Sequence, residues 1–223
     1  KKRYGILCLD IEGYQPEGGK LKAMGLEIKR SDTPEFIQDF LEELLVDCLN
    51  GLGEDHIIER IKEFKTYFKD LDPWGKGMPK RANNVTLYTA KMLEKATAPQ
   101  TNTLHKLNAL KNEKQSNMIP GHVRASINWN NLKKANSDAY SLTITDGMKV
   151  VVCKLKNNPM GYTSIAYPTD ELNLPQWFKD LPFDEEAMEE TVLDKKIENV
   201  IGPMGYDLSK TTQSETFSTF FEI

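Results

Sequence analysis

The residues of this sequence that could do chemistry are few and widely spaced. Asp10 and Glu12, in "DIEG", would lie on one side of a strand, because strand residues two apart face the same way. Two neighbouring carboxylates could bind Mg²⁺, although solvated residues at a strand end explain them equally well. His56, His105 and His122 lie far apart and match no zinc-binding spacing. Because no phosphate-binding Gly loop and no Ser/His/Asp or Cys/His set is present either, we predict no catalytic and no metal-binding residue, and no cofactor, in this chain.

The composition is that of an ordinary soluble protein. The 223 residues are 39% hydrophobic and 28% charged, enough for one sizeable domain or two small ones. No apolar run approaches the roughly 20 residues that cross a bilayer, and the apolar part of "KKRYGILCL" is too short for a signal peptide. Cys8, Cys48 and Cys153 are isolated in apolar surroundings, which predicts reduced core residues of a cytosolic protein. We therefore expect no membrane partner.

The distribution of charge is more informative than its total of −4. Residues 76–134 contain eleven Lys and Arg against two Asp and Glu, a net charge of +9. The flanking residues 31–75 carry −8, and residues 170–200 carry −7. Such a basic stretch within an acidic protein indicates a surface for a polyanion such as nucleic acid, with a solvated lysine face as the alternative.

The first part of the sequence predicts a hairpin followed by two helices. "KRYGILCL" and "KLKAMGLEI" are typical of strands and flank the Gly/Pro loop "EGYQPEGG". "SDTPEF" predicts a helix start with Asp32 or Thr33 as the cap and Pro34 at the first helical position. Apolar residues at helical spacing then predict two helices packed as an antiparallel pair. The predicted buried stripes are Phe36, Ile37, Phe40, Leu41, Leu44, Leu45 and Cys48 in the first helix and Ile57, Ile61, Phe64, Phe68 and Leu71 in the second.

The remainder predicts a mixed region. "PWGKGMPKRANN" (73–84) is predicted to be a loop with little to pack, and the polar residues 89–118 to be mobile, with a short helix through Leu104, Leu107 and Leu110. "MKVVVCKL" and "TSIAYP" predict a β-pair around the turn "KNNPMG", and an acidic helix is expected over roughly 184–201. Trp74 and Trp129 are expected in the core rather than as base-stacking platforms.

Several motifs occur together in a recognisable order. The sequence contains "KKRY" before a strand, "DxEG", "KLKAMGLE", a helix begun by proline, "ANN", "PxHxR", "NPMG" followed by "IAYP", and a terminal "FxxF". In this order the chain resembles the end of the palm and the thumb of family B DNA polymerases, and above all the replicative polymerases of T-even-type phages. The resemblance covers nearly the whole chain, with residues 89–118 as extra length.

The palm motifs that carry the family's metal-binding aspartates, "DxxSLYPS" and "DTDS", are absent from this sequence, and "KKANSDAY" does not match the nucleotide-binding motif "KxxxNSxYG". The resemblance therefore implies a C-terminal subunit or fragment, inactive alone. A separate N-terminal polymerase part, with fingers, palm and exonuclease, would supply the aspartates, and Mg²⁺ is expected in the assembled polymerase. The location implied is the cytoplasm of an infected bacterial host.

The fold implied is α+β, a mostly helical thumb with a small β-subdomain, preceded by a fragment of antiparallel palm sheet. The corresponding boundaries are 1–30 for the end of the palm, 31–210 for the thumb and 211–223 for a clamp-binding tail. The strands of the palm fragment would lack their neighbours, so we expect dimerisation or poor order there.

The resemblance places primer–template duplex DNA against two groups of residues. Lys1 or Lys2 with Tyr4 would contact minor-groove acceptors, which occupy similar places in every correct base pair, while Arg3 would face a phosphate or an acidic palm residue. The duplex-facing surface of the thumb would bind phosphates without reading sequence. Its predicted residues are Lys80, Arg81, Asn83, Asn84, His122 and Arg124, with a packed core histidine as the alternative for His122.

The aromatic end of the chain has its own predicted partner. Phe217, Phe220 and Phe221 fall within one helical turn after a polar linker, as in the peptide by which such polymerases bind the sliding clamp. A tail folded onto its own core is the alternative. Two other functions also remain open for the whole chain: a stand-alone, non-catalytic duplex-DNA-binding or clamp-interaction protein, and a helical interaction protein whose basic stretch is only solvated surface.

Overall fold

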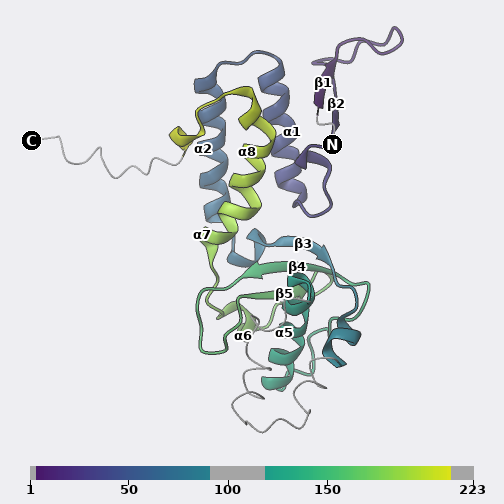
Figure 1. Cartoon of the computed structure of the whole chain (residues 1–223), viewed down its shortest axis with the longest axis vertical. Coiled ribbons are helices and arrows are strands. Elements are labelled where there is room, and N and C mark those ends of the chain that lie inside the picture. Colours follow the sequence, from purple (N-terminus) through teal and green to yellow (C-terminus); the bar gives the residue numbers. More distant parts are fainter. Residues whose placement is uncertain (1–3, 91–118, 212–223) are drawn as a thin grey trace, which may run out of the picture. The chain divides into compact units, whose positions relative to one another are not determined.

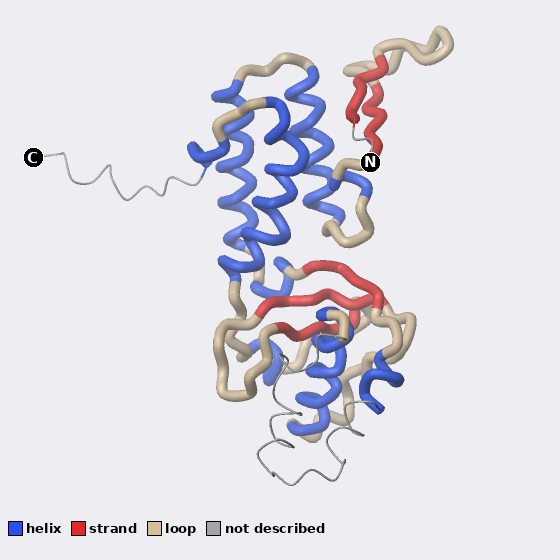
Figure 2. The backbone as a smooth tube through the Cα atoms, viewed as in Figure 1, coloured by secondary structure: helices blue, strands red, loops and turns tan. Residues whose placement is uncertain are grey.

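The computed structural model describes residues 4–90 and 119–211. The chain forms two compact units (Figure 1): a helical unit, residues 1–71 with 189–223, and a sheet unit, residues 72–188. Figure 2 shows that long helices make up most of the first unit, whereas the second contains a three-stranded sheet. The boundaries expected at residues 30 and 210 would separate the palm, thumb and tail of a polymerase, and they stay a prediction.

Helices α1 (Glu35–Leu49) and α2 (Glu54–Asp70) confirm the two predicted apolar stripes. Both helices bury most of their stripes, with Phe36 and Phe64 only partly buried, and α8 (Lys195–Ile201) packs against α1. The predicted cap was wrong by one position: Pro34 is the cap, and its carbonyl accepts the Gln38 N–H at 3.0 Å. Thr33 makes no side-chain cap because its hydroxyl instead bonds the buried Lys196 ammonium at 2.8 Å.

The acidic segment predicted over 184–201 is helical throughout but not uniform. It begins as α7 (Glu185–Met188) in the sheet unit, continues as a π-helical stretch (Glu189–Asp194), and ends as α8 in the helical unit. Two short 3₁₀ turns follow at Gly202–Met204 and Leu208–Thr211. The change from α to π helix therefore coincides with the change from one unit to the other.

The predicted hairpin is confirmed as β1 (Tyr4–Cys8) paired antiparallel with β2 (Lys20–Met24), with Tyr4 opposite Met24. A Cβ added at Gly5 would lie 2.9 Å from Leu45 Cδ2 of α1, so glycine permits this close approach of strand and helix. A short 3₁₀ turn, Glu27–Lys29, leads into the helices. In the part of the chain that the structure describes, β1 and β2 pair only with each other, which leaves one edge of each strand open.

The sheet unit contains a strand that the sequence analysis did not predict. Strands β4 (Lys149–Lys154) and β5 (Ser164–Pro168) confirm the expected β-pair, and β3 (Met78–Arg81) adds to the other edge of β4. The expected loop over 73–84 with little to pack was therefore wrong. A 3₁₀ turn (Pro73–Lys76) precedes β3, and its Lys76 is 2% exposed and pairs with Glu185 of α7.

Helix α5 (Gly121–Ala135) covers this sheet and packs mainly on β5. Trp129 of α5 is fully buried and contacts Phe178 of the short helix α6 (Gln176–Lys179), with 5.3 Å between ring centroids. Trp74 packs against the same core, so both tryptophans are core residues, as predicted.

The architecture confirms the α+β class: about half of the structure is helical, with two small antiparallel sheets. Within residues 4–90 and 119–211, no helix combines the length and the apolar character needed to span a bilayer.

Candidate nucleic-acid interface

Strand β3 and the first turn of α5 bring two of the predicted DNA-binding residues together. Lys80 lies opposite Val150 in the β3–β4 ladder, and cross-strand partners share a face, so its side chain leaves the sheet on the side of the buried Val150. Burial of the His122 ring lowers the pKa of His122 below its ordinary 6.5, and the positive charge of the Lys80 ammonium lowers it further. His122 is therefore neutral at pH 7, and one ring nitrogen can donate a hydrogen bond while the other accepts one.

The two predicted asparagines lie in an exposed turn that the sheet holds firmly. Between β3 and this turn, Ala82 is fully buried and exchanges hydrogen bonds with Met148 and Gly147. Asn84 has a φ of 61°, a left-handed conformation that asparagine tolerates, and its carbonyl accepts the Tyr88 N–H to begin a helical turn. Asn83 and Asn84 are thereby exposed beside Arg81, and their amides can donate to phosphate oxygens.

Not all of the predicted residues share one face. Arg81 follows Lys80 in β3 and is exposed on the opposite side of the strand. On α5, Arg124 comes two positions after His122, and helix residues two apart do not face each other. The structure thus places Lys80 with His122 and the asparagines beside Arg81, while Arg124 leaves α5 in a different direction.

The remaining predicted contacts lie elsewhere. Tyr4 is half-buried at the first position of β1. Lys1, Lys2 and Arg3 lie outside the described residues, as do Phe217, Phe220 and Phe221 of the predicted clamp-binding tail. Their roles stay predictions.

The carboxylates of "DIEG" do not share a strand face, so that expectation was wrong. β1 ends at Cys8, and Asp10 folds over the following turn, where its Oδ1 accepts the Gly13 N–H at 2.8 Å. Glu12 is in the turn itself, with a φ of 54°. Among the described residues no group of three or more His, Cys, Asp or Glu is arranged to hold a metal ion.

The structure adds a basic feature that the sequence analysis did not assign to DNA. Lys133 and Lys134, at the end of α5, line a hollow of about 450 Å³. Nearby, Tyr140 is 98% exposed because Asp138 holds the loop: its carboxylate accepts the N–H groups of Tyr140 and Ser141 and the Trp177 indole N–H. These hydrogen bonds keep the pKa of Asp138 well below its usual range. The hollow is also lined by Asp138, and Tyr140 does not line it. Paired lysines shortly before a tyrosine were the available signal in the sequence, since cations and exposed rings are groups that bind nucleic-acid strands.

Comparison with known proteins places the chain among relatives of DNA-directed DNA polymerases. Over 170 residues, 76% of this chain, it is 29% identical to the DNA-directed DNA polymerase of Enterobacteria phage T4 and 31% identical to that of Escherichia phage RB69. The resemblance to T-even-type phage polymerases is thereby confirmed. The matched segment spans 16% of the length of each of these relatives, and no family model matches the chain.

Proposed function

We propose that this chain is the part of a phage family B DNA polymerase that grips primer–template duplex DNA and tethers the sliding clamp. In this role it corresponds to the end of the palm and the thumb. The catalytic aspartates, and with them Mg²⁺, belong to a separate N-terminal part with fingers, palm and exonuclease. The observation that carries the proposal is the 170-residue match to two phage DNA polymerases in a chain that lacks the palm motifs.

The isolated hairpin supports a partner of this kind. β1 and β2 have open edges, and Ile6 and Met24 on this hairpin are 51% and 54% exposed. Large apolar side chains on an unpaired strand edge favour pairing with further strands. A palm sheet supplied by the N-terminal part would cover them and would fix the minor-groove contacts of Lys1, Lys2 and Tyr4.

The grip on the duplex would be electrostatic and independent of sequence. Arg81 and the two asparagines are exposed side chains that can donate hydrogen bonds, and Lys80 adds positive charge near His122, which suits phosphate oxygens. Arg124 would reach another phosphate from its own side of α5. The tail, through Phe217, Phe220 and Phe221, would bind the clamp and raise its local concentration at the primer end.

Primer extension with Mg²⁺ and dNTPs tests the proposal. This chain alone should give no extension, and the mixture with a chain carrying the N-terminal polymerase part should extend the primer. Primer extension by this chain alone would contradict the proposal. A mixture that does not extend the primer would contradict it as well. Duplex binding without extension in the mixture would favour a stand-alone DNA-binding module, for which the net charge of +9 over residues 76–134 is the supporting observation.

A matched pair of variants tests the DNA surface. Arg81→Gln should weaken duplex binding several-fold and lower the slope of log K against log salt by about 0.9, the value for one lost phosphate contact. Lys62→Gln makes the same charge change at an exposed position of α2 and should leave both quantities unchanged. Equal losses in the two variants would mean that only net charge matters.

A further inference from the structure

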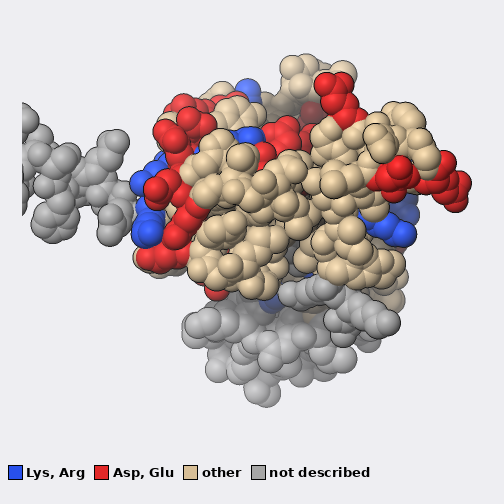
Figure 3. Space-filling view, turned by 90° about the horizontal axis from the view of Figure 1, so that it is seen from above, with Lys and Arg blue, Asp and Glu red and all other residues tan. Residues whose placement is uncertain are grey.

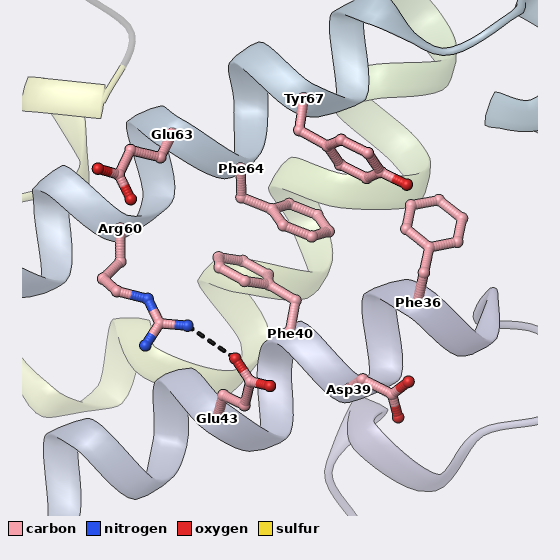
Figure 4. Close-up of a pocket in the computed structure, with 8 residues that line it drawn as sticks. All are labelled: Phe36, Asp39, Phe40, Glu43, Arg60, Glu63, Phe64 and Tyr67. Atoms are coloured by element: carbon pink, nitrogen blue, oxygen red, sulfur yellow. Dashed lines mark hydrogen bonds and ion pairs between the residues drawn. The ribbon is translucent and has the colours of Figure 1, made fainter.

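The helical unit carries an aromatic groove that the proposed DNA grip does not use. Its eight lining residues all come from α1 and α2, and it encloses about 450 Å³. Figure 4 shows its centre, where the rings of Phe40 and Phe64 face each other, with 3.7 Å between their centroids and an angle of 8° between their planes. Phe36 and Tyr67 extend the aromatic surface along the groove.

This surface is unusual for a face that only meets water. The helical spacing assigned Phe36 and Phe64 to the buried stripe, yet both are only partly buried, and Tyr67 is 50% exposed. Ile37 and Ile61 instead fill the core of the helical unit, where both are fully buried. Three partly or largely exposed aromatic rings that contact one another on one face, those of Phe36, Phe64 and Tyr67, indicate an interaction surface rather than scattered exposure.

The charges around the groove indicate what it can bind. Asp39, Glu43 and Glu63 line it, and Arg60 is its one lining cation. Arg60 donates to Glu43 at 2.7 Å (Figure 4) and to Asp47 at 2.8 Å, so its charge is already matched by two carboxylates. On the face viewed in Figure 3, the acidic surface is more extensive than the basic surface. A negative rim repels nucleic acid and favours a cationic partner.

We propose that the α1–α2 groove binds a basic helical segment of another polypeptide, which packs apolar side chains against the exposed parts of Phe36, Phe64 and Tyr67 and pairs its lysines or arginines with the acidic rim. A helix suits the groove because it presents apolar anchors at i, i+3, i+4 and i+7 along one line, flanked by charge. This site is separate from the DNA surface and does not depend on the proposed function.

Two other occupants conflict with the charges. A second copy of this chain would bring the same acidic rim against itself in a two-fold contact. The tail, residues 212–223, has three phenylalanines but carries Glu215 and Glu222 and no lysine or arginine. Both would place like charges together, which opposes binding.

A designed peptide pair tests the groove with the full chain. The probe is a fluorescein-labelled 16-residue helix with Leu at the anchor positions and Lys elsewhere, and the control peptide carries Glu in place of every Lys. The Lys peptide should bind saturably, and in ¹H–¹⁵N spectra it should shift the amides of α1 and α2 around Phe40 and Phe64. The Glu peptide should not bind.

Matched variants separate this site from general attraction to an acidic protein. The double change Asp39→Lys with Glu63→Lys should weaken binding of the Lys peptide at least about tenfold, and Tyr67→Ser several-fold. Glu198→Lys, at an exposed position of α8 that does not line the groove, should have little effect. Circular dichroism would confirm that each variant is folded.

Several results would overturn the proposal. They are the absence of binding at 1 mM peptide, amide shifts confined to other elements, and equal weakening by Glu198→Lys. A dimer in light scattering that the Asp39/Glu63 variant abolishes would make a second copy the occupant. Groove amides that shift when residues 212–223 are deleted would assign the groove to the tail instead.

Discussion

At the scale of single residues, the electrostatic effect of Lys80 on His122 leads to a prediction about the pKa of His122. Burial and the Lys80 charge both disfavour the protonated imidazole, so the pKa of His122 is below 6.5 in the folded chain. Lys80→Gln should raise the pKa of His122 but leave it below 6.5, because burial is the larger cause. An NMR titration of the histidine side chains, with His122→Gln for assignment, measures this. An unchanged pKa in Lys80→Gln would show that the two groups do not interact.

The same shift couples stability to pH. As pH falls through 6.5, the unfolded chain takes up a proton at His122 before the folded chain does, so the free energy of unfolding decreases. Neutral His122 contributes its full stabilisation to the folded chain above pH 6.5, and this stabilisation is lost completely below the folded-state pKa of His122. Urea unfolding between pH 8 and pH 5 should therefore show a smaller decrease in His122→Gln than in the parent chain. An identical decrease in both would assign the effect to other groups.

The positions of several single residues could not be predicted from the sequence. The sequence predicted that "PKR" and "PGHVR" form one basic surface, and this was only partly correct. Lys80 and Arg81 are neighbours in a strand and therefore lie on opposite faces. His122 and Arg124 are two positions apart in a helix and therefore point in different directions. The display of Tyr140 depends on the hydrogen bond from Trp177 to Asp138, 39 residues away. No local pattern carries that information.

At the scale of elements, Gly77 controls how β3 joins the sheet. A Cβ at this position would meet the Val151 side chain and lie 2.8 Å from Cys153 Sγ and 3.0 Å from the Val152 carbonyl oxygen. Since a backbone atom cannot move aside easily, Gly77→Ala should lower the free energy of unfolding by about 2–3 kcal/mol. Because β3 carries Lys80 and Arg81, the substitution should also weaken duplex binding.

Urea unfolding and a duplex-binding titration measure the two effects of Gly77→Ala. The matched control is Gly121→Ala, where an added Cβ meets nothing within 4 Å at the start of α5. That control should keep both stability and binding. Equal behaviour of the two variants would contradict the packing of β3 against β4.

The contact between α2 and the π-helical stretch makes a second element-scale prediction. Lys65 is 7% exposed, and its ammonium lies 2.8 Å from Asp194 and 4.0 Å from Glu189. Asp194→Asn should cost about 2 kcal/mol, because the buried ammonium keeps only its longer contact. The double change Lys65→Met with Asp194→Asn should cost less than Asp194→Asn alone, because it also removes the buried ammonium that the single change leaves with only its longer contact. Equal losses of the two variants in urea unfolding would contradict this account.

The elements divide into those with local signals and those without. The stripes of α1 and α2 and the apolar runs of β4 and β5 around the turn "KNNPMG" are local signals, and all four elements were predicted. β3 is four residues long, with a proline and two cations, and its partner Val152 lies 74 positions after Met78. The buried Lys65, Lys76 and Lys196 were equally unpredictable, because the carboxylates and hydroxyl that accept them come from distant segments.

At the scale of the whole molecule, charge is divided between the two units. The sheet unit, residues 72–188, contains 15 Lys and Arg against 11 Asp and Glu, a net charge of +4. The remaining residues contain 14 against 22, a net charge of −8. The division agrees with the two proposals, because the proposed phosphate-binding residues of β3 and α5 lie in the sheet unit and the aromatic groove lies in the helical unit.

The division also predicts how duplex binding depends on salt. Residues 91–118, outside the described part of the chain, supply five lysines against two glutamates, which is +3 of the sheet unit's +4. If these lysines contact phosphates, replacing Lys106, Lys111 and Lys114 with Gln should lower the log–log salt slope by up to about 2.7, at 0.9 per contact. The same change at Lys62, Lys69 and Lys195, three exposed lysines of the helical unit, removes equal charge and should leave the slope unchanged. Fluorescence anisotropy from 50 to 300 mM salt measures both variants. A slope that is unchanged in the first variant would exclude phosphate contacts by these three lysines, and equal decreases in both variants would show that only net charge matters, because each variant loses three lysines.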